Sequence, residues 1–203
     1  MHFYSPKAYD YIRKTFKNKL PASSTIRAWY SSTDGFPGLS TESLQILQMK
    51  SQAAKNQGKQ LYGCLMMDEM AIRKQVQWDH SSKKFRGYID YGSCIHEQEE
   101  LPLAKEALVY LITCVNERWK IPVAYFLIDS LTAQERAEIT RKVLDFLVPS
   151  GITIVALTFD GLAANISMSQ ELGANIFTNK PYFFHPSNSD KKNFYYFGCS
   201  SYV

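Results

Sequence analysis

The stretch Leu61–Lys74, LYGCLMMDEMAIRK, decides how the rest of the chain is interpreted. It begins as a run of apolar and small residues typical of a buried β-strand, and the run ends on two adjacent carboxylates, Asp68 and Glu69. A second apolar run, ITIVALTF at 152–159, ends in the same way on Asp160. In open sheets, ligand sites form in crevices at the carboxyl ends of the strands. If these two strands are parallel neighbours, the aspartates Asp68 and Asp160 therefore meet in one crevice.

The spacing of the carboxylates alone leaves two interpretations open. Two close carboxylates repel each other and are stabilised by a hard cation such as Mg²⁺, which prefers oxygen ligands. Such ions activate the attacking oxygen and stabilise the leaving oxygen in phosphodiester chemistry. Alternatively, an aspartate after a strand only builds a turn or caps a helix, as Asp160 before Gly161 would do. Glu69 points away from Asp68 on a continuing strand, so we expect it to be a turn or salt-bridge residue.

The composition is that of a folded, mildly basic protein. The chain has 203 residues, of which 45% are hydrophobic and 21% charged, and its net charge is +4. This charge permits nucleic-acid binding without requiring it. The four cysteines lack the C-x-x-C spacing of zinc sites and predict a reducing, intracellular environment. The sequence shows no secretory signal and no apolar run of about 20 residues, so we expect no membrane contact.

Two regions with different patterns follow each other along the chain. Residues 1–58 show three short helical patterns with tight connections, which is typical of a helix-turn-helix DNA-binding module. Residues 59–203 alternate strands with two helices, and the clearer helix begins with a capping box formed by Thr132 and Glu135. This order predicts an α/β (α+β) fold, a mixed sheet with helices packed on it. The absence of a G-x-G-x-x-G motif excludes a dinucleotide-binding fold.

The strands of the second region are predicted from apolar runs and alternating patterns. They fall at 61–67, 72–79, 85–92, 107–115, 121–128, 152–159 and 191–198. The second and third of these are separated by a short polar turn and predict a hairpin.

Basic residues gather near the start of the chain. Arg13, Lys14 and Lys17 lie at the end of the first predicted helix, and Arg27 lies on the second. Cations at a helix C-terminus complement the helix dipole, which is one explanation of this cluster. The other is phosphate contact by a helix-turn-helix module, with these four residues binding DNA. Trp29 is expected to be a core residue rather than a base-stacking one.

Several segments, in this order, resemble the P-element family of DNA transposases, and most of all the THAP-domain transposases of animals. The resemblance is carried by LPASSTIRAWY (20–30), LYGCLMMDEMAIRKQVQWD (61–79), FRGYIDYG (85–92), LAKEALVYLITCVNERWKIPVAYFLID (103–129), VALTFDGLAANISMSQELG (155–173) and PYFFHPSN (181–188). It implies an RNase H-like domain with a D-D-E triad, preceded by a helix-turn-helix region that contacts transposon-end DNA. The first two acids of the triad match Asp68 in MMDEM and Asp160 in TFDG. Their implied role is to bind two Mg²⁺ or Mn²⁺ ions.

Three features of that family do not occur in this sequence: the zinc-binding THAP domain, the insertion domain in which a GTP site is expected, and the catalytic glutamate. We therefore expect an incomplete RNase H-like fold and a transposase fragment that is inactive as it stands. The intact family carries out metal-dependent hydrolysis and strand transfer of DNA. The alternative is a domesticated, non-catalytic derivative that binds DNA or protein. The family also implies a nuclear location and a homo-oligomer.

Overall fold

The computed structural model of the protein describes residues 5–31, 35–79, 83–92, 102–175, 177–178, 180–186 and 194–199, and it describes 30–31 and 194–199 by their backbone alone. The chain forms two compact units, residues 1–36 and residues 37–203. No helix of the described residues is both long and apolar enough to cross a membrane.

The first unit contains two helices, α1 (Pro6–Thr15) and α2 (Ser23–Ser31). As the sequence predicts, α1 begins at Pro6, and the Ser5 side chain accepts a hydrogen bond from a backbone N–H of the first turn at 3.2 Å. Tyr9 is buried and donates its hydroxyl to the Pro21 carbonyl at 2.7 Å. This contact ties α1 to the segment that leads into α2.

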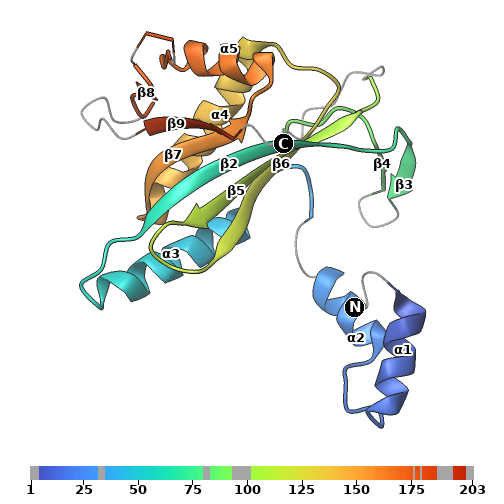
Figure 1. The fold of residues 1–203 in the computed structure, drawn as a ribbon. Helices are drawn as coiled ribbons and strands as arrows, with labels where there is room; N and C mark the ends of the chain where they lie inside the picture. Colours follow the sequence, from blue (N-terminus) through green and yellow to red (C-terminus); the bar gives the residue numbers. More distant parts are fainter. Residues whose placement is uncertain are drawn as a thin grey trace. The chain divides into compact units, whose positions relative to one another are not determined.

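The second unit is built on a mixed sheet. Its strands are β1 (Gly38–Leu39), β2 (Tyr62–Ala71), β5 (Glu106–Cys114), β6 (Lys120–Ile128), β7 (Thr153–Asp160), β8 (Tyr182–Phe183) and β9 (Phe194–Cys199). In the described residues they are ordered β1-β6-β5-β2-β7-β9-β8 (Figure 1). The central strand β2 pairs antiparallel with β5 and parallel with β7, and β7 pairs parallel with β9. The predicted α/β mixed sheet is thus confirmed.

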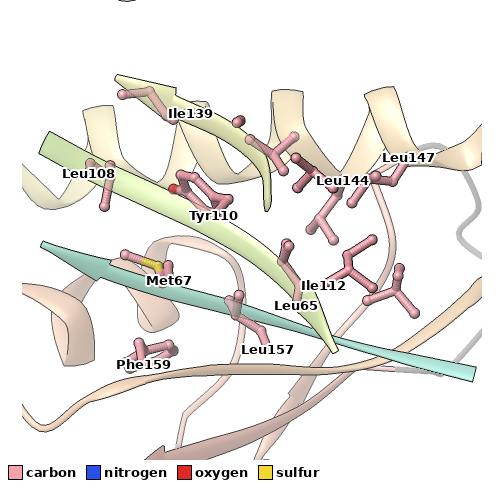
Figure 2. Packing of buried hydrophobic residues seen from close by; sticks show 14 of the residues in the cluster. Leu65, Met67, Leu108, Tyr110, Ile112, Ile139, Leu144, Leu147, Leu157 and Phe159 are labelled. Atoms are coloured by element: carbon pink, nitrogen blue, oxygen red, sulfur yellow. The ribbon is translucent and has the colours of Figure 1, made fainter. Parts of the chain in front are cut away.

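Helices cover one face of this sheet. They are α3 (Thr41–Lys55), α4 (Ala133–Leu147), the short 3₁₀ helix η1 (Val148–Ser150) and α5 (Ala163–Glu171). The predicted capping box of α4 is present, with Thr132 and Glu135 bonded to each other's backbone N–H. Apolar side chains of α4 pack on those of the central strands, and Figure 2 shows this layer. The core residues labelled in Figure 2 are Leu65, Met67, Leu108, Tyr110, Ile112, Ile139, Leu144, Leu147, Leu157 and Phe159.

The opposite face of β2 is open. Its side chains there are those of Tyr62, Cys64, Met66, Asp68 and Met70, and all of them except the half-buried Cys64 are exposed. Side chains alternate between the two faces of a strand, so the same alternation that buries Leu65 and Met67 presents these residues to solvent. A carboxylate on this face is accessible from outside.

The third helix belongs to the sheet rather than to the N-terminal module. Leu47 of α3 is completely buried in the core of the second unit, and the Ser51 hydroxyl donates to the Gly151 carbonyl at 3.0 Å. Gly151 has φ +72°, and a Cβ there would lie 2.6 Å from the Ser51 Oγ. The units therefore divide at 36/37 and not at 58, because the apolar side of α3 is buried against the sheet domain.

The predicted hairpin forms, but it is shorter than expected and separate from the main sheet. Its strands are β3 (Gln77–Asp79) and β4 (Lys84–Arg86). Trp78 and Phe85 pack edge to face across it, with ring centroids 4.9 Å apart, and both side chains are exposed. Without a second layer to bury its side chains, the hairpin keeps only this short pairing.

Candidate metal-binding site

The parallel pairing of β2 with β7 brings the two predicted aspartates to neighbouring positions. Met66 pairs with Thr158, and two residues further along the two strands are Asp68 and Asp160. Neighbouring strands lie about 4.8 Å apart, so two side chains at this register can share one ion. The Cys64 Sγ lies 3.0 Å from the Thr158 Oγ1. The alternation of side chains then directs Asp68 and Asp160 to the face shared by these two residues.

Asp68 lies inside β2, whereas the sequence predicts that it follows the strand. The strand continues to Ala71 because β5 pairs with it over its whole second half. The Asp68 side chain is exposed, and its Oδ1 accepts the Glu69 backbone N–H at 2.9 Å. This local bond orients the carboxylate without burying it.

Asp160 is the last residue of β7, directly before the turn into α5. Its Oδ1 accepts the Leu162 N–H at 3.3 Å and the Asn165 Nδ2–H at 2.6 Å. The turn-building role that the sequence left open for Asp160 is therefore present. Because both bonds use the same oxygen, this role is compatible with a ligand at the other oxygen of the carboxylate.

Glu69 has the salt-bridge role that the sequence predicts for it. It points to the helix-covered face of β2 and forms an ion pair with Arg136 of α4. Arg136 also donates to the Asn165 Oδ1 at 3.3 Å. Burial lowers the pKa of the Arg136 guanidinium, and the negative charge of Asp160 opposes this shift. Neither Arg136 nor Asn165 is predicted from the sequence, because α4 and α5 carry no local signal of a buried polar contact.

The donor set suits a hard divalent cation. Two carboxylates on adjacent parallel strands offer oxygen ligands, and no lysine or arginine of the described residues forms a salt bridge with either. In the described part of the chain, no group of three or more His, Cys, Asp or Glu side chains is placed to hold a metal ion. Asp68 and Asp160 would thus share an ion that takes its remaining ligands from water or phosphate.

The predicted DNA-binding residues lie in the first unit and differ in availability. Lys14, Lys17 and Arg27 have exposed side chains. Arg13 is half-buried and donates to the Leu20 carbonyl at 3.1 Å and to a neighbouring asparagine, so it stabilises the end of α1. Trp29 is 59% exposed, so the prediction of a core position for it is wrong.

Comparisons with known proteins identify the family and the fold of the chain. Residues 35–173 match the family model of the TNP-like RNase H N-terminal domain, and residues 1–29 match that of the transposable element P transposase-like HTH domain. The human protein DNA transposase THAP9 is 32% identical over 201 residues, which is 97% of this chain and 22% of that protein. The chain thus spans less than a quarter of the length of this relative.

A solved structure has the same fold. The Drosophila P element transposase strand transfer complex superposes with a TM-score of 0.71 at 20% identity, over 97% of this chain and 38% of the solved chain. The predicted RNase H-like fold is therefore confirmed. The chain belongs to the P-element-like transposase family, and its residues 35–173 form the RNase H N-terminal domain of that family.

Proposed function

We propose that this chain supplies two metal-binding carboxylates, Asp68 and Asp160, to a centre that hydrolyses and transfers DNA strands. The observation that carries the proposal is the register of β2 and β7, which aligns two acids from distant parts of the chain on an open face. Family membership supports DNA as the substrate and the nucleus as the location. A homo-oligomer stays a prediction.

Asp68 and Asp160 would contribute to such a centre in different ways. Asp68 presents its carboxylate from the central strand β2, where pairing with β5 fixes the backbone. Asp160 presents the oxygen that the α5 turn leaves free. Mg²⁺ or Mn²⁺ held between them would polarise a phosphodiester and favour ionisation of the attacking hydroxyl. The open face of β2 leaves room for a DNA backbone to approach both carboxylates.

The first unit is proposed to bind DNA through exposed cations. Lys14, Lys17 and Arg27 are available for phosphate contact, whereas Arg13 contributes by holding the end of α1. Phosphate contacts of this kind are sequence-independent, and the affinity they give falls steeply with salt. These helices would hold the chain on DNA while the two aspartates contribute to the chemistry.

The metal site is tested by titrating the chain with Mn²⁺ and following the free ion by electron paramagnetic resonance. We expect Asp68→Asn and Asp160→Asn each to weaken Mn²⁺ binding by at least about tenfold, because one carboxylate is a poor site for a divalent ion. Glu171→Gln, which removes an exposed charge at the far end of α5, is the matched control and should bind like the parent chain.

The outcome that contradicts the proposal is Mn²⁺ binding that both aspartate variants retain. Residues 1–203 alone, loaded with Mn²⁺, should leave a supercoiled plasmid intact, because two carboxylates that share one ion do not supply the ligands of a two-metal centre. Nicking that Asp68→Asn abolishes would instead show that these residues suffice for cleavage.

A further inference from the structure

A polar relay crosses the helix-covered side of the site and joins the two strands that carry the aspartates. It consists of Glu69 on β2, Arg136 on α4 and Asn165 on α5, and it ends on Asp160. Arg136 forms an ion pair with Glu69 and donates to the Asn165 Oδ1 at 3.3 Å. Asn165 in turn donates its Nδ2–H to the Asp160 Oδ1 at 2.6 Å. The four side chains form one continuous chain of contacts.

The two central members of the relay are deeply buried. Arg136 is 6% exposed and Asn165 is 4% exposed. The Arg136 Nε is buried and has no hydrogen-bond partner among the described residues. A buried ion pair is weak evidence for stability, because apolar residues of similar volume often stabilise a core equally well or better. The charge of Arg136 is desolvated at this position, so the presence of arginine there points to a role other than stability.

The relay acts on both aspartates. Glu69 follows Asp68 directly, and its backbone N–H is the donor to the Asp68 Oδ1 at 2.9 Å. The ion pair with Arg136 anchors Glu69 to α4 and thereby fixes the backbone that presents the Asp68 carboxylate. At the other end, Asn165 engages one oxygen of Asp160 and sets the direction of the second. Carboxylates that ligate metals are commonly oriented by such hydrogen-bond partners.

We propose that Arg136 and Asn165 are positioning residues that set the carboxylates of Asp68 and Asp160 for one shared divalent cation. This inference rests on the proposed function, in which these two aspartates bind the metal. Neither residue touches the ion itself. Arg136 and Asn165 act through the helix-covered side of the sheet, while the ion and the DNA phosphate occupy the open side.

The test is the Mn²⁺ titration of two variants that break the relay at different points. Asn165→Leu removes the donor to Asp160, and the double variant Glu69→Gln, Arg136→Met removes the buried charges together, so that neither is left unpaired. Each should weaken Mn²⁺ binding about 10- to 100-fold, which is the usual effect of losing an orienting partner. The thermal unfolding midpoint and far-ultraviolet circular dichroism should stay close to those of the parent chain.

Two matched substitutions outside the relay, at the half-buried Arg141 of α4 and the exposed Gln170 of α5, serve as controls. Arg141→Met on α4 and Gln170→Leu on α5 change side chains of the same types outside the relay, and should leave Mn²⁺ affinity within about threefold of the parent value. Arg136→Lys, which retains the charge and loses the planar fork, should give an intermediate affinity.

The outcomes separate this inference from the proposed function. If the parent chain binds Mn²⁺ and the two aspartate variants do not, but both relay variants bind within about threefold of the parent, the positioning role is wrong and the metal site stands. If the aspartate variants bind Mn²⁺ as well as the parent chain does, the proposed function itself fails. Should Asn165→Leu not fold, the double variant decides the question alone.

Discussion

At the scale of single residues, two neighbouring central strands carry polar side chains that differ in burial. Asp68 on β2 is exposed, whereas Tyr110 on the neighbouring β5 is completely buried and hydrogen-bonds the Thr140 hydroxyl at 2.9 Å. Burial raises the pKa of the Tyr110 phenol well above its ordinary value of 10.0, and the bond to Thr140 opposes the shift only in part. The difference follows from the face of the sheet on which each side chain lies.

Tyr110→Phe should make the free energy of unfolding fall less steeply with pH in the alkaline range. In the parent chain the phenol ionises more easily in the unfolded state than in the folded one. Its contribution to the free energy of unfolding is therefore complete below about pH 10, and it is lost as the pH rises toward the pKa of the folded state. Urea unfolding at several pH values measures the slope. Tyr62→Phe, on the exposed face of β2, is the control and should keep the parent slope. Equal slopes for Tyr110→Phe and the parent chain would count against the buried, protonated phenol.

At the scale of elements, α4 is the helix on which the sheet domain depends. It begins at its capping box, where the Glu135 N–H donates to the Thr132 Oγ1 at 3.2 Å and the Glu135 carboxylate accepts the Thr132 N–H at 2.8 Å. The Thr132 N–H, together with the Thr132 hydroxyl that also donates to this carboxylate at 2.8 Å, lowers the pKa of Glu135. The apolar side of the helix then fills the core above the central strands (Figure 2).

Thr132→Ala should lower the free energy of unfolding by about 0.5–2 kcal/mol, the usual cost of losing an N-cap side chain. Urea denaturation at neutral pH measures this change. Ser167→Ala, at an exposed position of α5, should change stability by less than about 0.5 kcal/mol. A Thr132→Ala variant as stable as the control would show that the cap contributes nothing in the folded domain.

The same elements show how much the sequence could predict. The apolar run of β2 and the capping box of α4 are local patterns, so a strand and a helix start were predicted at these places. The partner of an apolar helix face is decided by the tertiary fold, and α3 was therefore assigned to the wrong unit. The relay of Arg136 and Asn165 was missed for the same reason. Its residues are far apart in the sequence and meet only when α4 and α5 pack together.

At the scale of the whole molecule, the chain combines two units that correspond to two regions of one family. The HTH model covers residues 1–29 and the RNase H N-terminal model covers residues 35–173, in agreement with the division at 36/37. Within the second unit, acids from the first and the fourth long strands in chain order lie at adjacent positions of the sheet. A site that is composed in this way depends on the complete sheet rather than on any local motif.

The shared metal site is tested most directly by cleavage of the protein backbone by bound iron. Fe²⁺ in place of Mg²⁺, with ascorbate and peroxide, generates radicals that cut the chain close to the ion, and mass spectrometry locates the cuts. A metal ion shared by the two aspartates predicts cuts near both Asp68 and Asp160, competed away by Mg²⁺, and the loss of both sets of cuts in Asp68→Asn and in Asp160→Asn alike. Cuts at one aspartate only, or cuts that persist in either variant, would contradict a shared site.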